Sequence, residues 1–141
     1  MQRFGHGPRY GDRLPGIQLT VTARSPTGAA SGAARDSFVT HEQFVTYPKQ
    51  NAAKHDDVAG RGNGFVDVFD TDGHLLRRFT SRGPLNSPWA VTRASFAFGR
   101  FSGRILIGNF GNGRINAFDN HGQFAGELED PQGNPVVIDG L

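Results

Sequence analysis

The chain has 141 residues, enough for one domain of ordinary size, and a formal net charge of +2 at pH 7. Glycine (20 residues) and proline (8 residues) are frequent, and cysteine is absent. The sequence contains no apolar run of about 18 residues, the length that a membrane-spanning helix needs. These features exclude a coiled coil, a collagen, a membrane span, disulfides, thiol catalysis and cysteine-ligated metals.

Basic residues are concentrated near the start of the chain. Residues 1–40 carry five arginines and two aspartates, whereas residues 41–141 carry ten basic and eleven acidic residues. The larger part therefore has no basic stripe. Its Phe and Arg residues are also not interleaved as a platform for stacking bases requires. We expect no nucleic-acid partner.

The first 36 residues differ in texture from the rest. Residues 1–13 contain no apolar h-region, so the sequence shows no signal peptide there. Ile17, Leu19 and Val21 alternate with polar residues, which permits one short strand. Residues 25–35 consist of Ser, Pro, Thr, Gly, Ala and Arg, and they cannot bury enough apolar surface to offset their ordering entropy. We expect residues 1–36 to be a flexible or divergent segment, largely irregular.

From residue 37 the chain consists of short apolar runs bounded by Gly, Asn, Asp and Pro. Their length and their β-branched and aromatic content predict strands, and no helical period survives the spacing of glycine and proline. The expected strands are residues 44–49, 65–70, 75–80, 89–94, 104–109, 114–119 and 123–129. The sequence therefore predicts an all-β fold.

A 49-residue repeat organises these strands. Gly62-Asn63-Gly64, Phe69-Asp70 and Gly73 recur, 49 residues later, as Gly111-Asn112-Gly113, Phe118-Asp119 and Gly122. Asn-Gly supplies the positive φ of a tight hairpin, and an aspartate followed by glycine closes a second turn. A four-stranded unit of this length is typical of a β-propeller blade. We predict a partial β-propeller with three strands of one blade (37–82), one complete four-stranded blade (88–129) and the start of another unit (130–141).

A propeller closes with at least four blades, and this chain supplies fewer. Either the chain is a fragment of a longer propeller, or copies of it form a homo-oligomer that closes the ring. In a monomer the apolar faces of the blades would lack a partner. We therefore expect Val66, Val68, Ile105 and Ile107 to be partly exposed in the isolated chain.

Longer strings, at residues 54–70, 84–89, 108–119 and 133–141, carry a family resemblance. They resemble an uncharacterised bacterial family of exported β-propellers, which is related to NHL-type propellers and often bears PEP-CTERM sorting signals. The resemblance covers about residues 44–141. It implies a propeller fold and an exported or extracellular location, and it brings no established activity.

The loops expected over the central channel hold the candidate site residues. Asn86 and Asn109 are neutral polar residues near that channel, and we predict that they bind a ligand. The alternative is that they bond the backbone within their own turns. His55, Asp56 and Asp57 lie in the longest of these loops and are candidate ligands for a divalent cation. The alternative there is a solvated loop.

A second acidic motif, Asp70-Thr71-Asp72-Gly73, resembles the opening of a calcium loop. It lacks the distal glutamate of such loops, so we interpret it as a hairpin turn. The sequence also contains no Gly-x-Ser-x-Gly elbow, and its three glutamates are scattered. We predict no catalytic residues.

The predicted function is a non-enzymatic propeller segment without a cofactor. It would act as a scaffold or as a module that binds an unidentified ligand or protein. The alternative is a remnant of a propeller related to the metal-dependent lactonases and hydrolases, with a divalent ion held by Asn109 and Asp139.

Overall fold

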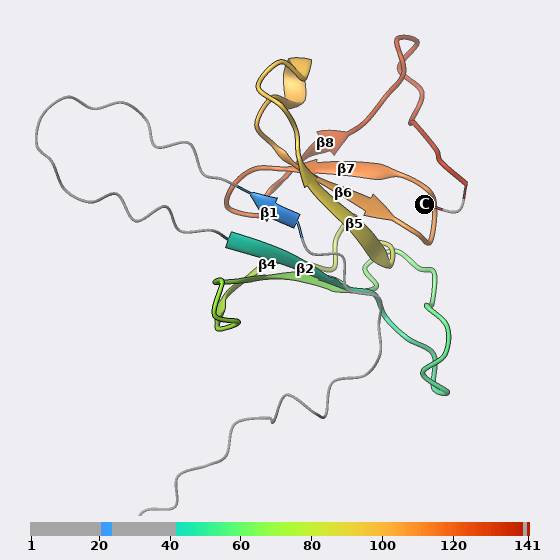
Figure 1. Ribbon diagram of the computed structural model, residues 1–141. Helices are drawn as coiled ribbons and strands as arrows, with labels where there is room; N and C mark the ends of the chain where they lie inside the picture. The colour runs from blue at the N-terminus through green and yellow to red at the C-terminus, as the bar shows by residue number, and fades with distance from the viewer. Residues whose placement is uncertain (1–20, 24–41, 140) are drawn as a thin grey trace, which may run out of the picture.

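The computed structural model describes residues 21–23, 42–139 and 141 (Figure 1). Most of the predicted N-terminal segment, 1–36, therefore lies outside the described residues. Within the described ranges the chain is all-β, as predicted, and its one helical element is a short 3-10 turn. No helix in this part is both long enough and apolar enough to span a membrane.

The strands form two antiparallel sheets, each of which follows chain order. The first sheet contains β1 (Val21–Ala23), β2 (Glu42–Tyr47), β3 (Phe65–Phe69) and β4 (Leu75–Ser81). The second contains β5 (Pro88–Arg93), β6 (Ile105–Asn109), β7 (Ile115–Phe118) and β8 (Phe124–Glu127), with the 3-10 turn η1 (Gly99–Phe101) before β6. The seven predicted strands are confirmed to within two residues at each end. Strand β1 adds a short edge strand to the first sheet.

The two sheets pack on each other around one shared apolar core. Strand β5 of the second sheet lies against β2 and β1 of the first (Figure 1). The rings of Phe79 and Phe118 meet edge to face across the interface, with centroids 6.2 Å apart. The buried residues of this shared core are Phe44, Val66, Val68, Phe79, Leu85, Val91, Ile105, Ile107 and Phe118.

This packing corrects one expectation. Val66, Val68, Ile105 and Ile107 were expected to be partly exposed, but each has 0% of its surface exposed. The expectation was wrong because it treated each blade face as open, whereas each sheet here covers the other. Burial of apolar area of this kind stabilises a fold by about 25 cal/mol per Å².

The repeat relates the two sheets as successive units that face the same way. We define the front face of the first sheet as the face that carries Phe44, Val66, Val68 and Phe79. The front face of the second sheet is the face that carries the equivalent residues of the repeat. The 49-residue offset and the strand pairing give the front face of the second sheet as Leu106, Ile115, Ala117 and Leu128. The first front face packs on the opposite, or back, face of the second sheet, which carries Ile105, Ile107 and Phe118. The sheets are therefore stacked front to back.

The front face of the second sheet has a smaller core of its own. Phe101, at the end of η1, packs there with Leu106, Ala94 and Ala117. Ile115 and Leu128 pack against this group but are only partly buried. Within the described residues, a loop thus covers the second front face at Leu106 and Ala117 and leaves it partly open at Ile115 and Leu128.

Candidate functional site

Three connections meet at one end of the two sheets, as the sequence predicted for its loop face. They join β2 to β3, β4 to β5 and β6 to β7 (Figure 1). Backbone hydrogen bonds link them directly. The amide of Gly62 donates to the Leu85 carbonyl (2.6 Å), and the amide of Phe110 donates to the Ser87 carbonyl (3.0 Å). We call the three asparagines at this meeting point, Asn63, Asn86 and Asn109, the asparagine junction.

Asn86 lies at the centre of the junction. Its side-chain Oδ1 accepts a hydrogen bond from the Gly60 amide at 2.6 Å. Its carbonyl accepts one from the Gly111 amide at 3.0 Å, which ties the β4–β5 connection to both of its neighbours. The approach at Gly111 requires glycine, because a Cβ there would lie 1.9 Å from Asn86 Oδ1.

Asn109 is completely buried at the end of β6. Its Oδ1 accepts a hydrogen bond from the backbone amide of Asn86 at 2.8 Å, and its Nδ2 donates to the Arg114 carbonyl at 3.4 Å. Both predicted ligand-binding asparagines thus lie together at the loop end, as expected from the sequence. Their side-chain oxygens accept backbone amides of neighbouring connections, whereas the alternative drawn from the sequence was bonding within their own turns.

The third member, Asn63, was not predicted as a site residue. Its Nδ2 donates to the Val58 carbonyl at 2.9 Å, and the hydroxyl of the buried Ser87 donates to the same carbonyl at 2.6 Å. The Asn-Gly repeat at 63–64 and 112–113 was the available signal. By itself that repeat predicts only the geometry of a hairpin.

The candidate metal ligands His55, Asp56 and Asp57 are bonded to two different residues, Asn51 and Trp89. The backbone amide of His55 donates to Asn51 Oδ1 at 3.2 Å, and Asn51 Nδ2 donates to Asp56 Oδ2 at 3.2 Å. The Asp57 carboxylate accepts a hydrogen bond from the indole nitrogen of Trp89, on β5. The side chains that the sequence grouped together therefore face an asparagine, solvent and the second sheet.

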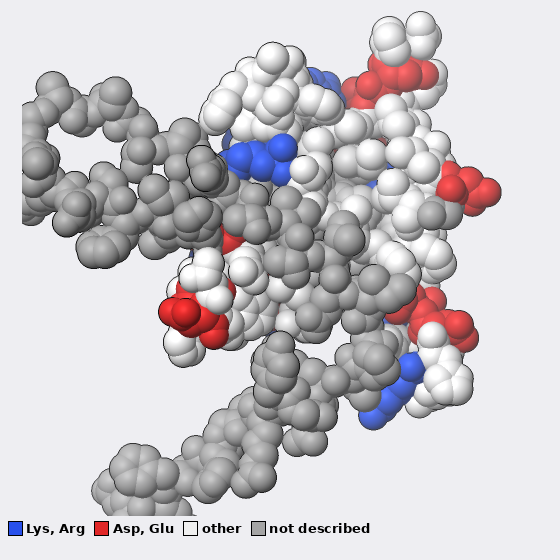
Figure 2. Space-filling model, in the orientation of Figure 1, with Lys and Arg blue, Asp and Glu red and all other residues white. Residues whose placement is uncertain are grey.

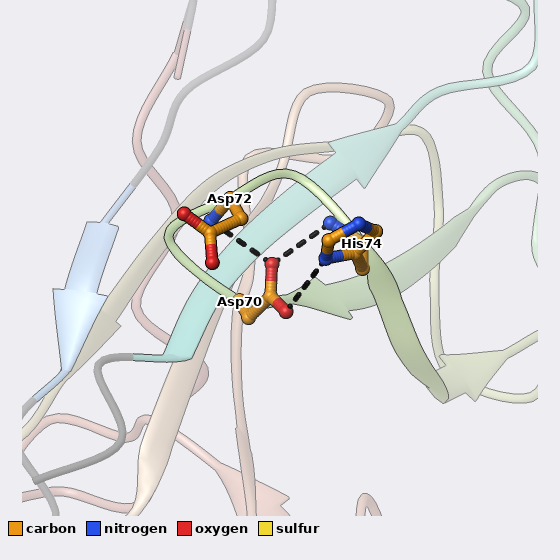
Figure 3. A group of neighbouring side chains, drawn as sticks. All are labelled: Asp70, Asp72 and His74. Atoms are coloured by element: carbon orange, nitrogen blue, oxygen red, sulfur yellow. Dashed lines mark hydrogen bonds and ion pairs between the residues drawn. The ribbon is translucent and has the colours of Figure 1, made fainter. Parts of the chain in front are cut away.

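The structure brings together a different set of potential ligands, Asp70, Asp72 and His74. Within the described ranges this is the one group of three such side chains whose ligand atoms all lie within 4.8 Å of one another. Figure 3 shows them around the β3–β4 hairpin tip. Asp70 Oδ1 accepts from the amides of Asp72 (3.0 Å) and His74 (2.8 Å), and Asp70 Oδ2 lies 3.1 Å from the His74 ring Nδ1. The hydrogen bond from the backbone amide of His74 is the main cause that lowers the pKa of the Asp70 carboxyl below its ordinary value.

The same bonding recurs at two more tips. Asp119 Oδ1 accepts from the amides of His121 (2.8 Å) and Gln123 (2.9 Å). Asp130 Oδ1 accepts from Gln132 (2.9 Å) and Asn134 (2.8 Å). We call the segments 70–74, 119–123 and 130–134 the aspartate turns. In each, the fourth residue is a glycine with φ between +81° and +84°.

The comparison among the turns shows what their aspartates do. The positions of Asp72 and His74 hold His121 and Gln123 in the second turn, and Gln132 and Asn134 in the third. The feature that all three share is a carboxylate that accepts two backbone amides, which is the bonding of an Asx-type turn. The hairpin interpretation accounts for the group at 70–74 without an ion. The third turn was missed because no predicted strand followed it.

A pocket of about 340 Å³ lies elsewhere, on the front side of the second sheet. It is lined by Phe98, Arg100, Phe101, Leu128, Glu129 and Asp130. Arg100 and Glu129 form an ion pair there, with 3.2 Å between Nη2 and Oε2. In the view of Figure 2, acidic and basic side chains are scattered over the surface and form no broad field of one sign.

Comparison with known proteins found three uncharacterised proteins of Acanthamoeba polyphaga mimivirus. One is 48% identical over 84 residues, which are 60% of this chain and 21% of the relative. A second is 48% identical over 80 residues (57% and 21%), and a third is 35% identical over 104 residues (73% and 20%). The chain thus spans about a fifth of the length of the curated relatives it matches.

These relatives correct the resemblance drawn from the sequence. The predicted resemblance to a bacterial family of exported propellers was wrong, since the similar proteins are viral and uncharacterised. No family model matches the chain. No solved structure matches it either.

Proposed function

We propose that this chain is a pair of adjoining β-propeller blades that acts as a scaffold or binding module and not as an enzyme. The blades would be residues 37–82 and 88–129. The front-to-back packing of two four-stranded meanders carries the proposal. Propeller blades are four-stranded meanders repeated around an axis, and each contacts its neighbours in this sense.

The length of the relatives supports a repeat protein. A match of 84 residues is 21% of one relative, so that relative has about 400 residues. A chain of that length has room for about eight units of 49 residues, within the range of four to eight blades found in propellers.

The bonding at the loop end supports a non-catalytic role. The face over a propeller channel is the usual place for a site, and here it is occupied by the asparagine junction. The Oδ1 atoms of Asn86 and Asn109 are bonded to backbone amides, so these side chains hold loops in place. For the alternative, a metal-dependent hydrolase remnant, Asn109 would have to leave the amide of Asn86. We therefore place that alternative second.

Calorimetry on the full chain with Ca²⁺, Mg²⁺ and Zn²⁺ tests the proposal. We expect no saturable binding of any of the three ions at millimolar concentration. Tight one-to-one binding that is lost in Asp139→Asn and kept in Asp72→Asn would contradict the proposal and favour the hydrolase remnant. The Asp72 variant is the matched control, because it removes a carboxylate from an exposed aspartate turn.

A further inference from the structure

We propose that the front face of the second sheet is a docking surface for a following four-stranded sheet of the same repeat. The inference rests on the proposed function and names the partner of one surface. The partner is a sheet whose back face carries an aromatic residue at the repeat position equivalent to Phe118. Its ring would enter the pocket beside Leu128.

The interface between the two sheets is the template. Phe79 of the first front face is covered by the ring of Phe118, from the back face of the second sheet. The β7–β8 turn also closes on Phe79, since a Cβ at Gly122 would lie 1.8 Å from the Phe79 carbonyl oxygen. One front face is thus completed by the ring and the turn of the next sheet.

Leu128 is the repeat equivalent of Phe79, and its surroundings are open. Phe79 is 4% exposed, whereas Leu128 is only partly buried and lines the pocket of about 340 Å³. Phe98 lies in the same lining and is 43% exposed. The pocket therefore lies beside Leu128, close to the position equivalent to the one that Phe118 fills beside Phe79. Three lining residues are apolar (Phe98, Phe101 and Leu128) and three are charged (Arg100, Glu129 and Asp130). Exposed apolar residues that lie together are typical of a surface that meets a partner.

The path of the chain indicates where the partner comes from. The amide of Ser87 donates to the Asn63 carbonyl (3.0 Å) just before β5 crosses the first front face. The amide of Ile138 donates to the Gly113 carbonyl (2.8 Å) at the corresponding place on the second sheet. Residues 84–87 and 135–138 thus both bond to the connection that precedes the third strand of their sheet. The pairing is parallel between Asn63 and Asn86 and antiparallel between Arg114 and Val137.

The contacts of Leu141 continue this correspondence. Thr46 of β2 donates through its hydroxyl to the Trp89 carbonyl, and strand pairing makes Gly108 its equivalent in the second sheet. Leu141 packs on Gly108 so closely that a Cβ there would lie 2.4 Å from Leu141 Cδ2. The segment at Leu141 therefore occupies the place that Trp89 and Ala90 occupy on the first sheet. A sheet that continues from this segment would lie on the second front face, and this favours a following repeat over a second copy of the chain.

An extended chain tests the proposal. A second copy of residues 91–141 is joined after Leu141, because the contacts of Leu141 match those of Trp89 and Ala90 on the first sheet. The extended chain should unfold in one transition and at a higher temperature than the original chain. Leu128→Arg should change the midpoint of the original chain little but lower that of the extended chain by more than about 5 °C, because the charge would be buried only there. Phe98→Arg, at a more exposed lining position, should show the same difference.

Leu76→Arg is the matched control, because Leu76 is 50% exposed on β4 of the first sheet. It should change both chains equally. The proposal is overturned if the added sheet unfolds separately and if Leu128→Arg and Phe98→Arg act equally in both chains. It is also overturned if the original chain self-associates and Leu128→Arg abolishes this, since the occupant would then be another copy. Failure of the proposed function would show instead as tight cation binding by the original chain.

Discussion

The asparagine junction and the aspartate turns use the same kind of bond in two different environments. In both, a side-chain oxygen accepts backbone amides and fixes a connection between strands. The aspartate turns lie at exposed tips, where an amide that loses its partner rebinds water. Asn109 is completely buried, so the amide that it satisfies would have no replacement. The same local chemistry should therefore be essential to stability at the loop end and a minor contribution at the tips.

The aspartate turn at 119–123 is an exception, and a substitution in it should have the largest effect on stability. Gly122→Ala places a Cβ 1.8 Å from the Phe79 carbonyl oxygen, so the two sheets must move apart. Strain at positive φ adds to overpacking, and together they should cost about 3 kcal/mol or more of unfolding free energy. Gly73→Ala is the control, since Gly73 has nearly the same φ (+84° against +81°) but its Cβ would meet no atom within 4 Å. Urea unfolding of both variants measures the difference, and equal costs would contradict the packing of this turn on the first sheet.

Asn109→Ala should have the next largest effect. It leaves the amide of the partly buried Asn86 without its acceptor, the completely buried Asn109 side chain, which should cost about 2 kcal/mol of unfolding free energy. Asn112→Ala, at an exposed residue of the same loop that accepts the Arg114 amide at 3.2 Å, should cost less than about 0.5 kcal/mol. Chemical denaturation compares the two. If Asn112→Ala proved as costly as Asn109→Ala, burial would not be what distinguishes the junction from the turns.

Trp89 sharpens the comparison at the margin of the junction, because it is half-buried. Trp89→Phe removes the indole donor to Asp57 and should cost about 1 kcal/mol. A double-mutant cycle with Asp57→Ala isolates this bond. The expected coupling between the two positions is positive, and a coupling of zero would mean that the Asp57 loop is not held by β5.

Acid should reveal the smallest effect, that of the exposed turns. The pKa values of Asp70, Asp119 and Asp130 are lowered from an ordinary value of 3.8, mainly by hydrogen bonds from His74, Gln123 and Asn134. A carboxyl with a lowered folded pKa stabilises the fold at higher pH, and this contribution is lost as the pH falls below the ordinary value and through the folded one. Thermal midpoints measured from about pH 5 to about pH 2 should fall, and less steeply in Asp130→Asn. An unchanged slope in that variant would show that its turn does not contribute.

The strands could be predicted because their signals are local. An Asn-Gly turn precedes β3 and β7, and an Asp-x-x-Gly turn precedes β4 and β8, so the turns mark these strands without knowledge of the partner sheet. The burial of Ile105 and Ile107 could not be predicted in the same way, because it depends on how one sheet lies on the other. The third aspartate turn, at Asp130, was missed for the opposite reason, since no strand follows it to mark a hairpin.

The candidate site was predicted in place but not in its bonding. The sequence put Asn86 and Asn109 together at one end of the sheets, since strand order decides which loops are neighbours. The sequence could not decide whether a ligand or the backbone is their partner. The partner of the Asn109 side chain is the amide of Asn86, which lies 23 residues away along the chain. His55, Asp56 and Asp57 show the same limit, because adjacent residues in a loop need not face one partner.

Hydrogen exchange in Val68→Ala tests most directly the claim that the two sheets share one core. Val68 is fully buried in the first sheet, at the interface with the second. The account predicts that the amides of β3 and of β7 lose protection by the same factor, because the sheets open together. Loss of protection confined to β2, β3 and β4, with β6 and β7 unchanged, would contradict it.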